Sequence, residues 1–152
     1  MCAYNAVNGD PACASGPLLQ RALKDDWQFD GFVVSDCGAV NDIVDGHKAA
    51  ADLPHASARS LKAGTDLSCG KEYASLAAAV KQGLVSEREI DAALARLLTA
   101  RFRLGMFDPA ASVPFNAIPF SENDSPEHAR FALEAARASM MSRPLDVSSL
   151  EL

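Results

Sequence analysis

Two aspartates stand at the ends of short predicted strands and are the first candidates for chemistry. Asp36 comes shortly after the apolar run 32–34, and Asp66 lies near the end of the predicted strand 63–67. A carboxylate at the end of a buried strand is costly to bury without partners, which makes it a candidate for function. It can equally cap a loop or helix by accepting hydrogen bonds from backbone N–H groups. Both interpretations remain open for both aspartates, whereas Tyr4 is expected by the same test in the core or at its rim.

The cysteines are the other reactive groups of the chain. They are Cys2, Cys13, Cys37 and Cys69. None belongs to a C-x-x-C pair, and the three histidines are spaced unsuitably for shared ligation, so we expect no structural zinc site. No cofactor is expected either. Four cysteines allow three disulfide pairings, and the sequence does not choose among them; small buried apolar thiols are the alternative.

The composition and charge limit the classes of partner. Of the 152 residues, 49 % are hydrophobic and 22 % are charged, which is typical of globular proteins. The net charge of −6 disfavours nucleic acid and anionic membranes as partners, because both attract basic surfaces. No apolar run approaches the roughly 20 residues of a membrane span. No signal peptide precedes the polar stretch after Met1, so the compartment is left undetermined.

The elements that must position these groups alternate between strand and helix. Strands are predicted at 1–4, 32–34 and 63–67, and helices at 17–27, 55–62, 72–82 and from about 87 to 104, with 39–52 only weakly helical. Such alternation implies parallel strands joined by right-handed crossovers. Three strands cannot close a barrel, so the pattern fits either an open sheet or the last part of an eight-stranded barrel. In both, the active site lies at the C-terminal ends of the strands.

The C-terminal part of the chain has its own start and stop signals. Ser86 and Glu89 form a capping box at the start of the longest predicted helix. Residues 109–125 contain three of the eight prolines and no helical period, which predicts an ordered linker. Pro126 suits the first position of a last helix that runs to about Met140.

Five segments, in order, resemble glycoside hydrolase family 3, in its β-xylosidase- and β-glucosidase-like branches. Residues 31–36, Gly-Phe-Val-Val-Ser-Asp, resemble the nucleophile motif. The others resemble the preceding strand and loop (1–9), the final barrel strand (63–67), the end of the last barrel helix (101–108) and the inter-domain linker (119–120 and 125–128). The resemblance extends from residue 1 to about residue 140.

The resemblance implies an α/β fold made of the last three strand–helix units of a TIM-type parallel barrel. Residues 1–108 would be this C-terminal part of the barrel, followed by a linker at 109–125. Residues 126–140 would form the first helix leading to an absent second domain, and 141–152 an unpatterned tail.

The resemblance also implies roles for individual residues. Asp36 matches the nucleophile, which forms a covalent glycosyl-enzyme intermediate in retaining glycosidases. Tyr4 matches a substrate-site tyrosine whose hydroxyl can orient that carboxylate, while Asp66 matches no catalytic residue, which favours its structural interpretation. Cys37 replaces a tryptophan common in the family. With Cys69, at the end of a neighbouring strand, it resembles a disulfide that lines a narrow sugar pocket and favours pentoses.

Parts of such an enzyme are missing. The family's first five barrel strands are absent, as is the acid/base glutamate of its second domain. Three glutamates could be considered as replacements for this acid/base group: Glu89, Glu122 and Glu127. They are unsuitable, because they lie in a helix cap, a linker and a first helical turn, respectively. We therefore expect a gene fragment, a truncated reading frame or a frameshift product, whose full-length relatives could be secreted or periplasmic.

The expected function is that of a fragment of a retaining glycosidase, inactive alone, acting in a complete enzyme on β-linked xylosides or glucosides. The carbohydrate is thus the expected partner. Self-association through unpaired sheet edges is also expected. One alternative is a non-catalytic remnant. Another, a phosphate- or nucleotide-binding open sheet, is disfavoured because no Gly-rich loop joins a strand to a helix.

Overall fold

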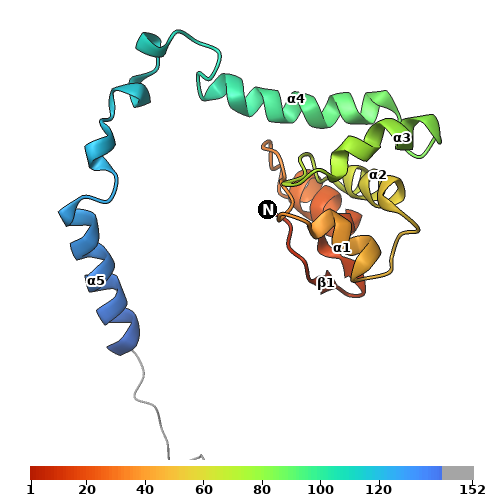
Figure 1. The fold of residues 1–152 in the computed structure, drawn as a ribbon, viewed down its shortest axis with the longest axis horizontal. Helices are drawn as coiled ribbons and strands as arrows, with labels where there is room; N and C mark the ends of the chain where they lie inside the picture. Colours follow the sequence, from red (N-terminus) through yellow and green to blue (C-terminus); the bar gives the residue numbers. More distant parts are fainter. Residues whose placement is uncertain (142–152) are drawn as a thin grey trace, which may run out of the picture. The chain divides into compact units, whose positions relative to one another are not determined.

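The computed structural model describes residues 1–141 (Figure 1). The chain divides into two compact units, residues 1–107 and the residues from Asp108 onward. The tail predicted to lack a pattern lies outside the described residues, apart from Met141 at the end of the last helix.

The first unit is mostly helical, and its only regular sheet among the described residues is a two-stranded hairpin. Its elements are β1 (Ala6–Val7), β2 (Asp10–Pro11), a 3₁₀ turn (Ala12–Ala14), a π-helix (Pro17–Asp26), α1 (Ala39–Asp45), α2 (Leu53–Ala63), a 3₁₀ turn (Glu72–Ser75), α3 (Leu76–Lys81) and α4 (Glu87–Arg103). The sequence predicted only a loop at the hairpin. Asn8 and Gly9 both have positive φ, 52° and 87°, which suits the tight turn joining two antiparallel strands.

The three predicted parallel strands are present only as short paired segments. Two isolated parallel bridges join Cys2 to Ser35 and Val34 to Leu67. Backbone hydrogen bonds from Cys2 N to Val34 O (2.9 Å) and from Ser35 N to Leu67 O (2.8 Å) hold the segments side by side in chain order. Each outer segment has a partner on one side only within residues 1–141, so the pairing does not extend into regular strands. The predicted strand lengths were therefore wrong, while the parallel direction and order are as predicted.

Several predicted helices differ in their bounds or type. The segment 39–52, predicted as weakly helical, contains α1. Helix α2 begins at Leu53 and includes Pro54, because Asp52 caps it through a hydrogen bond from His55 N (3.0 Å) and proline is tolerated in a first helical turn. The predicted helix 17–27 is a π-helix, in which Trp27 N donates to Ala22 O, five residues back (3.0 Å).

Helix α4 begins as predicted at a capping box. The Ser86 hydroxyl accepts a hydrogen bond from Glu89 N (3.3 Å), and the Glu89 carboxylate accepts one from Ser86 N (2.8 Å). Gly105 follows the helix with a φ of 69°, which suits the predicted end of the helix.

Two apolar clusters form the core of the first unit. Helix α2 contacts both α1 and α3 and lies between the clusters (Figure 1). The first cluster consists of Cys2, Cys13, Ala14, Leu19, Val33, Ala39, Val40, Ile43 and Ala56, and the second of Ala58, Leu61, Leu76, Ala79, Val85 and Ala93. The first cluster therefore includes side chains of the first two parallel segments, Cys2 and Val33, and the second attaches α3 and α4 to α2.

The second unit contains three 3₁₀ turns and helix α5 (Pro126–Met141). The turns are Ala110–Ser112, Pro114–Ala117 and Phe120–Glu122. The region predicted as a linker without helical period is thus ordered into single turns, each beginning at or directly after a proline. None of the helices in the described part of the chain is long and apolar enough to span a bilayer.

Candidate active site

Asp36 lies at the C-terminal end of the middle parallel segment. Its backbone N–H donates to the carbonyl of Cys2 (2.8 Å), which ties it to the neighbouring segment. Its carboxylate oxygen Oδ1 accepts a hydrogen bond from Cys37 N (2.7 Å), and no residue in the described part of the chain donates to Oδ2. The side chain is only partly buried, so a carboxylate oxygen remains accessible to a bound molecule. The surroundings of Asp36 therefore differ from those of a buried capping aspartate.

Gly38 makes the turn that follows Asp36 and leads into α1. Its φ is 85°, which favours glycine over any residue with a β-carbon. The backbone N–H of Ala39 donates to the carbonyl of Asp36 (3.1 Å) and closes the turn. The sharp turn keeps Asp36 at the end of the segment instead of within the helix.

Tyr4 lies beside this turn. Its hydroxyl donates to the backbone carbonyl of Cys37, the residue after Asp36, and its side chain is half exposed. The structure therefore places the Tyr4 hydroxyl against the main chain of the residue that follows Asp36, and not against the Asp36 carboxylate. Its role in orienting the carboxylate stays a prediction.

A disulfide joins Cys37 to Cys69 across two neighbouring segments, with a Cα–Cα distance of 4.5 Å. Ser35 strengthens this connection, because its buried hydroxyl accepts a hydrogen bond from Cys69 N (3.1 Å). The bridge lies one residue beyond Asp36. Tyr4, Asp36 and Cys69 are thus gathered at the same end of the paired segments.

A second disulfide joins Cys2 to Cys13, with a Cα–Cα distance of 5.1 Å. All four cysteines are therefore paired, and the alternative of buried free thiols was wrong. Spacing could not decide this, because a disulfide depends on how close two segments come in the folded chain.

Asp66 is the second candidate aspartate. Its side chain is fully buried and surrounded by hydrogen-bond donors. Its carboxylate contacts Lys24 Nζ (2.8 Å) and Arg96 (2.7 Å) and accepts a hydrogen bond from Val33 N (2.9 Å). Burial lowers the pKa of Lys24, and the hydrogen bond and charge of Asp66 oppose that shift. These contacts join four segments of the chain and confirm the structural interpretation of Asp66.

His47 lies in the turn after α1 and contacts the segment that carries Tyr4. The sequence did not predict a role for this histidine. Its Nε2 lies 2.7 Å from the carbonyl oxygen of Tyr4 and 3.3 Å from Asp42 Oδ2. Histidines were considered in the sequence only as metal ligands, and no local pattern marks this one. In the described part of the chain, no group of three His, Cys, Asp or Glu residues could hold a metal ion.

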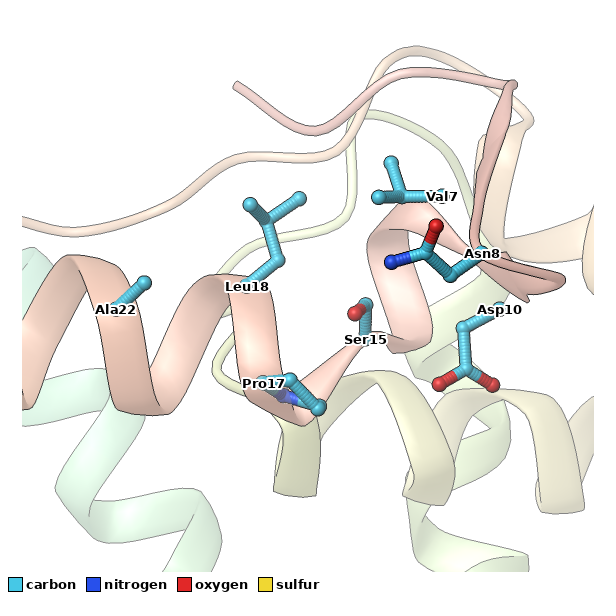
Figure 2. A pocket seen from close by; sticks show the side chains of 7 residues that line it. All are labelled: Val7, Asn8, Asp10, Ser15, Pro17, Leu18 and Ala22. Atoms are coloured by element: carbon cyan, nitrogen blue, oxygen red, sulfur yellow. The ribbon is translucent and has the colours of Figure 1, made fainter.

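A surface pocket of about 230 Å³ lies elsewhere, between the hairpin and the start of the π-helix (Figure 2). It is lined by Val7, Asn8, Asp10, Ser15, Pro17, Leu18 and Ala22. Asp10 is its only ionisable group, and that carboxylate is paired with Arg59 (2.8 Å). Since none of the residues gathered around Asp36 lines it, this pocket is not the candidate active site.

Residues 1–100 match the sequence profile of the glycosyl hydrolase family 3 N-terminal domain. The chain belongs to this family of glycoside hydrolases. It is 44 % identical over 143 residues to a xylan 1,4-β-xylosidase of Xylanibacter ruminicola, a match that covers 93 % of this chain and 17 % of the relative. This relative is therefore named for the β-xylosidase activity that the resemblance implied.

Solved structures of glycosidases are similar in fold. A family 3 exo-β-xylosidase, in complex with a xylobiose aziridine activity-based probe, aligns with a TM-score of 0.78 and 38 % identity over 88 % of this chain and 18 % of that one. A β-glucosidase of Erythrobacter marinus aligns with a TM-score of 0.75 and 35 % identity over 90 % of this chain and 18 % of that one. The chain thus spans less than a fifth of the length of these relatives.

Proposed function

We propose that this chain provides the nucleophile-bearing part of a retaining β-glycosidase, which cleaves β-linked xylosides or glucosides. Asp36 attacks the anomeric carbon, the bond to the leaving oxygen breaks, and a covalent glycosyl-aspartate forms that water later hydrolyses. The observation that carries the proposal is the position of Asp36. Its backbone is held by Cys2, and its carboxylate lies beside the Tyr4 hydroxyl contact and the Cys37–Cys69 bridge.

We propose further that the three paired segments are the last three strands of a TIM-type barrel. Their parallel direction, their order in the chain and the helices between them support this interpretation. Catalytic groups of such barrels lie at the C-terminal ends of the strands, which is where Asp36 lies. The preceding strands would then supply most of the contacts to the sugar.

The acid/base group of this reaction is proposed to lie outside the chain. Glu89 is engaged in the capping box of α4, and Glu127 contacts Arg130 (3.4 Å) in the first turn of α5. A protonated carboxyl group contributes about 10²–10⁴-fold when the leaving group is poor. The isolated chain is therefore expected to be inactive on natural oligosaccharides. The small fraction of each relative that it spans supports this expectation.

The substrate is proposed to be a pentoside in preference to a glucoside. The Xylanibacter ruminicola relative, which is named a xylosidase, has a higher identity to the chain than the Erythrobacter marinus β-glucosidase. We infer that the Cys37–Cys69 bridge, one residue beyond Asp36, limits the room for the additional CH₂OH group of glucose. The double substitution Cys37→Ser/Cys69→Ser should therefore lower the ratio of kcat/KM for an aryl β-xyloside to that for an aryl β-glucoside. An unchanged ratio would contradict this specificity role.

The test of the proposed function uses a chimera in which this chain replaces the matching segment of the Xylanibacter ruminicola enzyme. The chimera should hydrolyse an aryl β-xyloside and a xylo-oligosaccharide, and Asp36→Ala should abolish both activities. Asp91→Ala, which removes an exposed carboxylate from α4, is the matched control and should leave activity unchanged. A slow 2-fluoro xyloside should label Asp36, as detected by peptide mass spectrometry. Activity that survives Asp36→Ala, or a chimera without activity, would contradict the proposal.

A further inference from the structure

His47 connects α1 to the segment that carries Tyr4, although the two residues are 43 positions apart in the chain. A carbonyl oxygen only accepts hydrogen bonds, so the ring nitrogen Nε2 must donate to Tyr4 O. The contact distance of 2.7 Å is that of a well-formed hydrogen bond, and the side chain is only 23 % exposed. The contact is therefore a specific attachment between two parts of the fold.

The turn that carries His47 is itself held in place by α1. The backbone N–H of Gly46 (2.9 Å) and that of His47 (2.8 Å) both donate to the carbonyl of Asp42. The Asp42 carboxylate lies in the space that a β-carbon on residue 46 would occupy, so glycine at this position lets it approach the ring. Asp42 Oδ2 lies 3.3 Å from His47 Nε2 and limits the orientations of the imidazole. The ring nitrogen Nε2 thus faces both the Asp42 carboxylate and the Tyr4 carbonyl.

Holding the Tyr4 carbonyl fixes the end of the first parallel segment. Two residues earlier, Cys2 accepts the hydrogen bond from Asp36 N (2.8 Å), and one residue later Asn5 O accepts one from Ala12 N (2.9 Å). Between these points the Tyr4 side chain must reach across to the carbonyl of Cys37. Among the described residues, the contact with His47 is the one hydrogen bond that joins the Tyr4 carbonyl to the turn after α1. Without this contact, the backbone at Tyr4 is no longer attached to that turn.

We propose that His47 is a positioning residue that holds Tyr4 against the turn following Asp36. The proposal rests on the proposed function, because its consequence for catalysis requires that Asp36 be the nucleophile. The contacts of the His47 ring go to Tyr4 O and Asp42 Oδ2, and not to the Asp36 carboxylate. It acts through the Tyr4 backbone, so its loss should affect the reacting geometry more than binding of the sugar.

The variants separate the hydrogen bond from the bulk of the ring. His47→Gln retains an N–H donor at about the position of Nε2, whereas His47→Ala removes it. His55→Ala is the matched control, because His55 also contacts an aspartate, Asp52 (2.6 Å), but lies at the start of α2 and makes no contact with Tyr4. Both histidines lie within the first unit, and each contacts an aspartate through its ring.

The first measurement is amide hydrogen exchange of the full chain, read by peptide mass spectrometry. His47→Ala should speed exchange in peptides covering residues 1–5 and 36–38, His47→Gln should retain most of the protection, and His55→Ala should match the wild type. Unchanged exchange in His47→Ala, or the same change in His55→Ala, would overturn the proposal. So would a wild-type chain whose Asp36 amide is unprotected, because the segment that His47 holds would then not be formed.

The second measurement is steady-state kinetics in the chimera, on an aryl β-xyloside. His47→Ala should lower kcat about three- to tenfold, which corresponds to the loss of one hydrogen bond, with a smaller change in KM. His47→Gln should restore most of kcat. If Asp36→Ala abolishes activity while His47→Ala and His55→Ala are equal, the positioning role fails alone. If Asp36→Ala retains activity, the proposed function fails, and hydrogen exchange decides the positioning role independently.

Discussion

The Tyr4 hydroxyl oxygen lies 2.9 Å from the point where a β-carbon on Gly38 would stand. This close approach lets the hydroxyl reach the carbonyl of Cys37, directly after Asp36. Two features therefore favour glycine at position 38: its φ of 85° and the close approach of the Tyr4 hydroxyl. The side chain of one segment and the turn of the next thus depend on each other at the candidate active site.

Gly38→Ala should consequently be more harmful than the same change at another glycine with positive φ. Gly9, with a φ of 87° and no atom within 4 Å of a β-carbon, is the matched control. Both substitutions should cost about 1 kcal/mol of stability for the backbone conformation, and only Gly38→Ala should displace Tyr4. Tyr4→Phe, which removes the close oxygen, should relieve this additional cost in the double variant. Urea unfolding of the four variants measures it, and equal effects at the two glycines would contradict the expectation.

Asp66→Asn should destabilise the chain strongly, because it removes the buried charge between Lys24 and Arg96. Breaking a buried ion pair on one side costs about 3–5 kcal/mol. Asp30→Asn is the control. It removes a carboxylate that is 77 % exposed and contacts Arg103 (3.1 Å), where the expected loss is below about 1 kcal/mol. The free energy of unfolding, followed by circular dichroism in urea, should separate the two variants, and similar values would show that the Asp66 contacts contribute little.

The capping box of α4 should weaken in acid. The backbone N–H of Ser86 donates to Glu89 and lowers the pKa of that carboxyl below its ordinary value of 4.5. A carboxylate with a depressed pKa in the folded state stabilises it above the unfolded pKa, and this contribution is lost as the pH falls through the folded pKa. An NMR titration should give a Glu89 pKa below 4.5 that rises in Ser86→Ala.

Two variants separate the cap from its titration. Ser86→Ala should also cost about 1 kcal/mol of stability at neutral pH. Glu89→Gln retains a capping partner that does not titrate, so this part of the acid dependence should disappear. A Glu89 pKa that does not respond to Ser86→Ala would mean that the capping box does not form in solution.

The isolated chain should self-associate. The outer parallel segments each have one partner among residues 1–141, and several large apolar side chains of the first unit are exposed. They include Met1, Trp27, Phe29, Leu94, Phe102, Leu104, Met106 and Phe107. Light scattering after size exclusion should detect oligomers at micromolar concentration. A monomer with a sharp, reversible thermal transition would show that these surfaces need no covering.

Local signals in the sequence were enough to determine the elements whose stability is local. The capping box at Ser86 and Glu89 and the glycine at 105 marked α4, because both depend on neighbours within one helical turn. The apolar run before Asp36, together with the family motif, identified the end of the middle segment. Strand–helix alternation predicted the parallel direction of the three segments, since crossover connections require it.

The tertiary structure decided what depends on contacts between distant residues. The choice among disulfide pairings, the different fates of Asp36 and Asp66, and the attachment of Tyr4 by His47 all follow from how segments 11 to 43 residues apart approach one another. Asp66 and Asp36 occupy equivalent places in the sequence pattern. Folding places Asp66 beside Val33, at the beginning of the paired stretch, where Lys24 from the π-helix and Arg96 from α4 reach its carboxylate. Asp36 lies at the opposite, C-terminal end of that stretch and stays partly exposed.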